Sequence, residues 1–342
     1  MRQSPPKSTR RNFLQTAAAA TVLGAGTLPV GAADLKEINF SRQPGVLYLP
    51  MILMEHHKLV EKHAKLLGLG DVKVNWLTLT SGGAATDALL AGSLDFVTSG
   101  ATNMLLLWDR TKGQVKGVAG CGGLPMFLLT NNPNVKTIKD FTAKDKIAVP
   151  TIKVSTQATI LHMAAEKAFG PGKHGELDAF TVQMGHPDAT AAIMSSNNEI
   201  NSHFSLPPFQ QIALKDPKVH VVLRSDEVFG GPVNNAVTFT SAKFRNANPK
   251  GVAAVLAAID EAMGMIKAQP KESAVTYLAN VKDKITAEEL VDVITAKGAS
   301  FGAAPVGLNQ LSAFMARVGT LKTTPKDWKE FFWEEAHGLA GN

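Results

Sequence analysis

Cysteine is nearly absent from this chain of 342 residues: Cys121 is the only one, so no disulfide can form within the chain. Glycines flank it, and without a second thiol we interpret it as a small buried side chain. Aromatic residues make up only 6% of the sequence, which disfavours a cage of rings around a heterocycle.

Signatures of enzymatic chemistry are missing as well. Neither G-x-G-x-x-G nor G-x-x-x-x-G-K-[ST] occurs at a strand-to-helix junction, so a nucleotide-dependent enzyme is unsupported. No G-x-S-x-G elbow is present, and no serine can be assigned a base and an orienting residue. We therefore expect a protein that is not an enzyme, with no catalytic residue and no cofactor.

The first 33 residues are typical of an export signal. Four cations precede any acidic residue, and Thr16–Leu28 is uncharged and rich in alanine. The paired arginines of Thr9–Gln15 stand just before a Phe-Leu step, as in twin-arginine signals. The apolar run is about a dozen residues long, whereas a membrane span needs roughly 20, so we predict a leader that is cleaved after Ala32 or Ala33.

Removal of this leader changes the charge of the protein. Four of the 35 Lys and Arg residues lie in it, which leaves 31 against 29 Asp and Glu, a net charge of +2. This balance, and the lack of a basic block interleaved with aromatics, gives no reason to expect nucleic acid as a partner. We expect a periplasmic monomer that is exported by the twin-arginine machinery.

The mature sequence alternates short β-branched runs with longer segments of helical periodicity, which predicts mostly parallel sheets covered by helices in an α/β fold. The predicted strands are 36–41, 72–79, 94–98, 115–120, 126–130, 146–149, 180–184, 200–205, 219–223 and 236–240. The predicted helices are 46–67, 84–91, 103–110, 156–169, 188–196, 208–214, 249–268, 271–281, 286–295, 308–318 and 325–336.

Turn formers indicate where the chain passes between two lobes. They cluster near residue 131 and again at Gly230–Asn235, after which the strand 236–240 is expected to return to the first lobe. We therefore predict a leader over 1–33, a first lobe over 34–130 plus 236–342, and a second lobe over 131–235. The two crossings would form a hinge.

Three turns share one design, in which a strand is followed by small hydroxyl and glycine residues that open a helix: Ser81–Gly83, Ser99–Thr102 and Ser155–Gln157. The first N–H groups of a helix lack an internal partner and carry partial positive charge, so each turn can hold an anionic or polar group. Ordinary helix capping explains any one of them. Because ligands collect at the carboxyl ends of strands in open α/β sheets, three such turns favour a shared site.

Other polar residues have both a functional and a structural interpretation. Arg42 ends the first strand and can pair with a carboxylate or sulfonate, although a surface arginine fits equally. His186 ends a second-lobe strand and is a candidate ligand contact, whereas His203 lies inside a strand and is interpreted as a satisfied interior residue. The histidine cluster at Glu55–His63 matches no H-E-x-x-H pattern, so we expect a solvated face of a single helix and no metal site.

The segment Leu89–Gly100 reads Leu-Leu-Ala-Gly-Ser-Leu-Asp-Phe-Val-Thr-Ser-Gly, and a related pattern returns at Ala192–Ser202. With the order of the predicted elements, it resembles the solute-binding proteins of nitrate, taurine and aliphatic-sulfonate importers and their pyrimidine-precursor-binding relatives. The resemblance covers about residues 35–267. It implies a two-lobed periplasmic binding protein fold of type II that closes on its ligand, and an ABC permease in the inner membrane as a partner.

The resemblance also implies that Arg42–Gly45 and the three turns lie near the cleft. At Ser205–Phe209 many relatives carry an aromatic and an acidic residue before Pro-Phe, and at Asn201 they carry an aspartate; this chain lacks those side chains. The thiamine-pyrimidine synthases share the fold but need a cysteine-rich iron motif, which a single cysteine cannot supply.

The working hypothesis is the periplasmic solute-binding component of an ABC importer, which captures a small organic anion such as a sulfonate or carboxylate, or a nitrate-like ion, in the cleft. The alternatives are a binder of a neutral pyrimidine-type heterocycle and a periplasmic sensor subunit. The expected ligand-binding residues are Arg42, Gln43, Pro44, Gly45, Ser81, Gly82, Gly83, Ser99, Gly100, Ala101, Thr102, Ser155, Thr156, Gln157, His186, Ser205 and Asn235.

Overall fold

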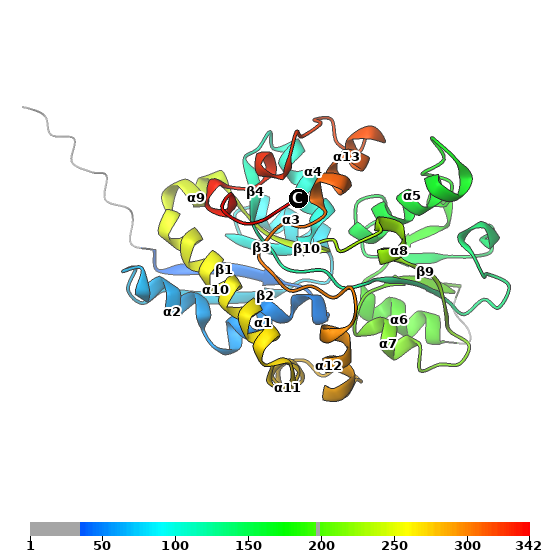
Figure 1. Cartoon of the computed structure of the whole chain (residues 1–342), viewed down its shortest axis with the longest axis horizontal. Coiled ribbons are helices and arrows are strands. Elements are labelled where there is room, and N and C mark those ends of the chain that lie inside the picture. The colour runs from blue at the N-terminus through cyan, green and yellow to red at the C-terminus, as the bar shows by residue number, and fades with distance from the viewer. Residues whose placement is uncertain (1–34, 196–198) are drawn as a thin grey trace, which may run out of the picture. The chain divides into compact units, whose positions relative to one another are not determined.

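Two mixed β-sheets of five strands each organise the computed structural model, which describes residues 35–195 and 199–342 (Figure 1). The first sheet has the strand order β2-β1-β3-β10-β4, and only β10 runs antiparallel to its neighbours. Its strands are β1 (Glu37–Arg42), β2 (Lys73–Thr78), β3 (Phe96–Gly100), β4 (Val115–Gly120) and β10 (Ala236–Ser241). The prediction that the strand after residue 235 returns to this sheet is confirmed.

The second sheet repeats this arrangement with the strand order β7-β6-β8-β5-β9, in which only β5 is antiparallel to its neighbours. Its strands are β5 (Phe127–Thr130), β6 (Ile147–Val149), β7 (Thr181–Gln183), β8 (Ser202–Ser205) and β9 (His220–Arg224). The predicted boundary at residue 130 puts the segment that forms β5 in the first lobe, but this segment pairs in the second sheet. Leu128 and Leu129 are fully buried, as in an interior strand, and the turn formers after residue 130 end this strand rather than mark the crossing.

Helices follow the strands of both sheets (Figure 1). The helices that follow strands of the first sheet are α1 (Leu49–His56), α2 (Leu59–Leu66), α3 (Gly82–Leu90), α4 (Ala101–Arg110), α9 (Ala242–Ala247), α10 (Pro249–Ala268), α11 (Pro270–Asn280), α12 (Ala287–Thr295) and α13 (Leu308–Arg317). The helices that follow strands of the second sheet are α5 (Thr156–Phe169), α6 (His186–Met194), α7 (Phe209–Ala213) and α8 (Ser225–Phe229). The 3₁₀ turns are η1 (Val46–Tyr48), η2 (Ile138–Asp140), η3 (Asp178–Phe180), η4 (Trp328–Phe331) and η5 (Glu334–Ala336).

Two of the predicted helices are wrong. The segment 46–67 is not one helix, because Lys58 adopts a left-handed conformation (φ 50°) that separates α1 from α2. The segment 325–336 forms only the turns η4 and η5. Here Phe332 bridges to Gly117 of β4, and a Cβ at Gly117 would lie 2.6 Å from the Phe332 ring, so the glycine makes room for this edge contact.

The two segments that pass between the sheets lie side by side. The amide of Asn235 donates to the carbonyl of Gly122 at 3.1 Å, and that of Cys121 donates to the carbonyl of Ala236 at 3.0 Å. A Cβ at Gly123 would lie 1.9 Å from the carbonyl oxygen of Val233, so only glycine allows this close approach. The crossings are therefore a paired connection rather than two independent linkers.

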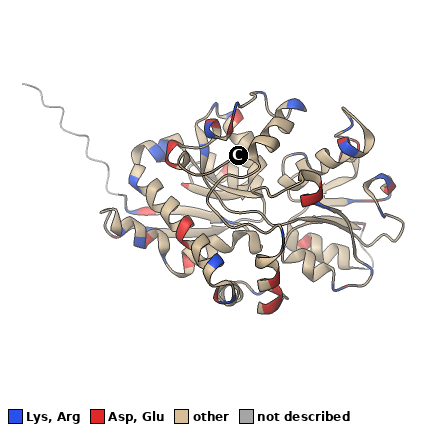
Figure 2. Cartoon of the chain, viewed as in Figure 1, with Lys and Arg blue, Asp and Glu red and all other residues tan. Residues whose placement is uncertain are grey.

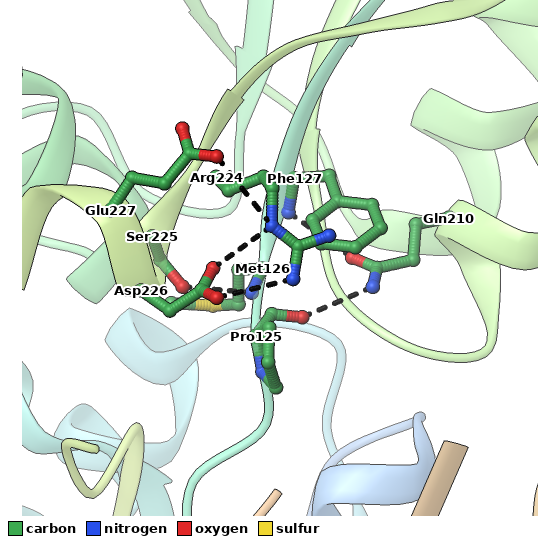
Figure 3. A network of polar contacts seen from close by, with 8 residues as sticks. All are labelled: Pro125, Met126, Phe127, Gln210, Arg224, Ser225, Asp226 and Glu227. Atoms are coloured by element: carbon green, nitrogen blue, oxygen red, sulfur yellow. Dashed lines mark hydrogen bonds and ion pairs between the residues drawn. The ribbon is translucent and has the colours of Figure 1, made fainter. Parts of the chain in front are cut away.

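Polar contacts attach the first crossing firmly to the second sheet (Figure 3). Gln210 accepts a hydrogen bond from the amide of Phe127 and donates one to the carbonyl of Pro125, while Ser225 accepts one from the amide of Met126. The guanidinium of Arg224 lies 4.5 Å from the centre of the Phe127 ring. Residues 125–127 of this crossing are thus held to the second sheet.

The predicted leader and its cleavage positions lie outside the described residues. Across residues 35–195 and 199–342, the structure contains no helix with the length and apolar character needed to cross a membrane.

Candidate functional site

A small enclosed cavity lies among the loops that follow the strands of both sheets. Its lining residues are Gln43, Leu47, Tyr48, Gly82, Gly100, Asn103, Met126, Pro150, Ser155, Thr156, Gln157, His186, Leu206 and Asn235. The cavity encloses about 20 Å³, which is room for roughly one water molecule. None of these side chains is a lysine, arginine, aspartate or glutamate.

The N-termini of four helices meet at this cavity. Gly82 opens α3, Gly100 immediately precedes α4, Thr156 opens α5 and His186 opens α6. The first N–H groups of each helix have no partner within the helix, and the helix dipole places partial positive charge there. The cavity therefore offers hydrogen-bond donors and a favourable potential for an anionic or strongly accepting group.

Glycine at two of these helix starts lets neighbouring groups approach closely. A Cβ at Gly82 would lie 1.9 Å from Nδ2 of Asn103, and a Cβ at Gly100 would lie 2.8 Å from Oγ1 of Thr156. Gly100 belongs to β3 of the first sheet, whereas Thr156 opens α5, which follows a strand of the second sheet. These two segments can approach so closely only because position 100 has no side chain.

Hydroxyl groups join the two sides of the site. Oγ1 of Thr102 donates to the carbonyl of Val154 at 2.6 Å, and Oγ1 of Thr156 donates to the carbonyl of Asn235 at 3.4 Å. Their donors and acceptors come from segments of different sheets or from the crossing, so the structure shows a closed arrangement of the cavity.

Asn235 supplies a side-chain donor whose orientation is determined by the backbone. Its Oδ1 accepts a hydrogen bond from the amide of Leu124 at 2.6 Å. This hydrogen bond fixes the orientation of the carboxamide. Its nitrogen, Nδ2, is buried and has no hydrogen-bond partner, and Asn235 as a whole is 2% exposed. A buried donor without a partner is costly, and a ligand acceptor in the cavity would remove that cost.

Two further polar groups belong to the first-sheet side of the cavity. Nε2 of Gln43 donates to Oγ of Ser99 at 2.9 Å, and Nδ2 of Asn103 donates to the same oxygen at 3.1 Å. Ser99 thus lies behind the lining and orients two amides that line it. Burial raises the pKa of Tyr48 well above its ordinary value, so its hydroxyl stays protonated and can act as a donor.

A buried chain of polar side chains forms the second-sheet side. Nε2 of Gln157 lies 3.2 Å from Nε2 of His186, and Nδ1 of His186 lies 2.9 Å from Nε2 of His203. His203 is fully buried, as predicted, but the expectation of a satisfied residue is wrong because its Nδ1 has no partner. Burial lowers the pKa of both histidines, so both rings are neutral at pH 7.

Arg42 does not line the cavity. Its Nε lies 3.0 Å from Oε2 of Glu55, the last-but-one residue of α1, and its side chain is 15% exposed. The neighbouring carboxylate offsets the attraction of the guanidinium for a second anion. The role of Arg42 as an anion clamp therefore remains a prediction from the sequence.

Eight of the seventeen predicted site residues meet at the cavity. Those that line it are Gln43, Gly82, Gly100, Ser155, Thr156, Gln157, His186 and Asn235. Those that do not are Arg42, Pro44, Gly45, Ser81, Gly83, Ser99, Ala101, Thr102 and Ser205. Several of the latter support the lining: Ser81 caps α3, and a Cβ at Gly45 would lie 2.6 Å from Cδ1 of Leu206.

Sequence reasoning missed Leu47, Tyr48, Asn103, Met126, Pro150 and Leu206 as lining residues. For two of them a signal exists, because Tyr48 follows shortly after the predicted turn at residues 42–45 and Asn103 directly follows the turn at residues 99–102. Leu206 could not be found from its type, since an apolar side chain next to a buried strand is normally part of the core.

The other singled-out residues have structural partners. His63 lies 2.7 Å from Oε2 of Glu261 and so links α2 to α10, while His56 contacts Asn280. Within the described part of the chain, no group of three or more His, Cys, Asp and Glu residues could hold a metal ion. Cys121 is fully buried, as predicted, with Sγ 3.0 Å from Oγ1 of Thr238, and burial raises its pKa to about 12.

Two five-stranded sheets with one antiparallel strand each, joined by paired crossings beside an enclosed cavity, give this chain the two-lobed α/β fold of periplasmic binding proteins, type II. No protein-family model matches the sequence. The search of curated proteins finds no matching sequence.

Solved structures with this fold resemble the chain over most of its length. One is the alkanesulfonate-binding protein SsuA from Xanthomonas axonopodis pv. citri bound to MOPS, at 15% identity and a TM-score of 0.66, covering 85% of this chain and 94% of that one. Another is the aliphatic sulphonate binding protein SsuA from Escherichia coli, at 18% identity and a TM-score of 0.63, covering 89% and 99%. A third is the nitrate-binding protein NrtA from Synechocystis PCC 6803, at 16% identity and a TM-score of 0.65, covering 90% and 89%. Solved members of the family suspected from the sequence thus share this fold.

Proposed function

We propose that this protein is the periplasmic solute-binding component of an ABC importer and that it holds a small organic anion, a sulfonate or carboxylate, in the cavity. The observation that carries the proposal is the set of donors around this cavity: four helix N-termini and Nδ2 of Asn235, which has no partner in the protein. The sulfonate- and nitrate-binding proteins with the same fold support the choice of ligand class.

An uncharged lining is compatible with an anionic ligand. Removing an anion from water is expensive unless hydrogen-bond donors replace its hydration shell. Backbone N–H groups at helix starts and amide side chains supply such donors without a counter-ion. Charged residues are instead interspersed over the helices in the view of Figure 2.

The size of the cavity makes opening necessary for ligand entry. A volume of about 20 Å³ holds roughly one water, so even a small sulfonate requires the two sides to separate. The hydroxyl contacts of Thr102 and Thr156 would break on opening and form again, or be replaced by ligand contacts, on closure. A closed form gains contacts from both sides, which couples binding to closure.

A neutral pyrimidine-type heterocycle is the second candidate ligand. The observation in its favour is the phenol ring of Tyr48 in a lining that contains no charged side chain. Such a ligand would use the same amide donors and would stack rather than rely on helix dipoles.

Thermal-shift screening followed by titration calorimetry tests the proposal. Sulfonates, carboxylates, nitrate and a pyrimidine are each added to the purified protein, since a ligand that binds only the folded state raises Tm. We expect a sulfonate or a carboxylate to raise it. If only the pyrimidine does so, the ligand class is wrong, and if no compound does so, the binding function itself is unsupported.

A further inference from the structure

The buried chain from Gln157 through His186 to His203 takes its direction of hydrogen bonding from the Gln157 amide, whose nitrogen faces His186. These residues are 5%, 6% and 0% exposed, so bulk solvent does not reach their contacts. The nitrogen of an amide can only donate, which makes Nε2 of His186 the acceptor of the contact at 3.2 Å.

The positions of the remaining protons follow from this first contact. Burial keeps both rings neutral, so each carries one proton. With Nε2 of His186 accepting, its proton is on Nδ1, which donates to Nε2 of His203 at 2.9 Å. The proton of His203 is then on Nδ1, the nitrogen that is buried without a partner.

This arrangement leaves the carbonyl oxygen of Gln157 for the ligand. Gln157 lines the cavity, its Nε2 is directed to His186, and no hydrogen bond within the described residues engages its Oε1. Asn235 and the N-termini of α3 and α4, which belong to other segments of the chain, present donors to the same cavity. The site therefore combines several donors with an acceptor.

We propose that His203 and His186 set the orientation of the Gln157 carboxamide, so that the site selects anions that also carry a hydrogen-bond donor, such as a hydroxyl, near the charged group. The proposal rests on the proposed binding function. In this scheme Gln157 contacts the ligand, and His203, which does not line the cavity, is a positioning residue.

The opposite direction of hydrogen bonding shows why His203 determines which end of the Gln157 carboxamide faces the cavity. If Nε2 of His203 donated to Nδ1 of His186, then Nε2 of His186 would donate to the carbonyl of Gln157. The amide nitrogen of Gln157 would face the cavity, and the site would select ligands that only accept. A substitution at position 203 that removes the acceptor for His186 favours this reverse arrangement, because it leaves Nδ1–H of His186 without a partner.

The test compares ligand pairs that differ by one hydroxyl: glycolate with acetate, and isethionate with ethanesulfonate. In titration calorimetry, we expect the hydroxyl-bearing member of a pair to bind the wild-type protein about tenfold more tightly, the effect of one satisfied rather than unsatisfied buried acceptor. His203→Leu should reduce this ratio of the two affinities to about one or below it. His203→Gln keeps an acceptor for His186 and should retain the wild-type ratio.

Two further measurements keep the test decisive if His203→Leu does not fold. Gln157→Met removes the acceptor itself and should also reduce the ratio to about one. Nitrogen NMR of the imidazole rings in the wild-type protein should show both His186 and His203 protonated on Nδ1 at pH 7.

The outcomes separate this inference from the function on which it rests. If no anion of either pair binds, the proposed function fails and the selection with it. If anions bind but the ratio of the two affinities in the wild type is about one, or if His203→Leu weakens both members of a pair equally, the proposed orienting role of His203 and His186 is overturned and the binding function stands. Protonation of either ring on Nε2 likewise overturns this orienting role.

Discussion

Arg317 donates two hydrogen bonds to the carboxylate of Glu166, one from each terminal guanidinium nitrogen, at 2.8 and 2.6 Å. The pair joins α13, in the C-terminal segment, to α5 of the second sheet's segment, away from the cavity. Its hydrogen bonds hold the pKa of Glu166 at about 2, below the ordinary value of 4.5. The two sides of the closed arrangement are thus also linked at the surface.

Replacing this arginine should produce a small, pH-dependent loss of stability. Because the folded-state pKa of Glu166 is depressed, the pair stabilises the protein fully above pH 4.5 and loses its effect as the pH falls from 4.5 toward 2. For an exposed pair we expect Arg317→Gln to lower Tm at pH 7 by no more than about 2 °C, measured by calorimetry. The difference from wild type should shrink below pH 4.5, and Lys250→Gln, at an exposed lysine, is the control that should show neither effect.

Asn235→Asp should separate an anionic from a neutral ligand. One carboxylate oxygen would keep the hydrogen bond from the amide of Leu124, and the other would replace the donor Nδ2 in the cavity. Repulsion and the loss of a donor should then weaken binding of a sulfonate or carboxylate by at least about 100-fold. The exposed Asn246→Asp, which adds the same charge outside the cavity, is the control for titration calorimetry. An equal loss in both variants would show that net charge, not the site, is responsible.

Arg42→Gln tests the side chain that the sequence favoured as an anion clamp. In the structure it pairs with Glu55, so we expect the affinity for an anion to change by less than about threefold in titration calorimetry. A loss of tenfold or more would mean that Arg42 leaves Glu55 and reaches the ligand when it binds.

Arg42 also shows which parts of the site the sequence could predict. The turns before α3, α4 and α5 were found because glycine and hydroxyl residues at a helix start have a local physical meaning. The partner of Arg42 was not, because Glu55 lies on a helix whose packing against the first strand is a tertiary contact. Local patterns therefore placed the backbone of the site, whereas the direction of long side chains depended on the fold.

The same limit explains the errors in the fold. Strand periodicity located β5 within a residue, but its sheet depends on pairing with β8 and β9, more than 70 positions away in sequence. The helical pattern of 325–336 was real, yet the segment adds to the edge of β4 through Phe332 and Gly117 instead. Long-range pairing decided which sheet the strand joins in the first case, and in the second it overrode a local helical preference.

The predicted leader can be tested without a structure. Mass spectrometry of the protein recovered from the periplasm should show an N-terminus at Ala33 or Asp34, because cleavage is expected after Ala32 or Ala33. Replacing both Arg10 and Arg11 by lysine should leave the uncleaved precursor in the cytoplasm, since the arginine pair is the feature read by the twin-arginine machinery. Periplasmic recovery of the double variant at the wild-type level would point to another export route.

Gly100→Ala should uncouple ligand affinity from stability. The added Cβ would lie 2.8 Å from Oγ1 of Thr156, so the segments of the two sheets could not approach as closely, while the backbone of Gly100 (φ −52°) accepts alanine without strain. We expect anion affinity to fall at least about tenfold, with a Tm change within about 2 °C, because the closest clash, with Thr156, arises on closure, whereas the contact within the first-sheet segment, with Nδ2 of Asn103, is longer at 3.2 Å. Small-angle scattering should show that excess ligand compacts the wild type more than the variant. Gly264→Ala is the matched control, since a Cβ there meets nothing within 4 Å, and a similar loss of affinity in that variant would remove the contact between Gly100 and Thr156 as the cause.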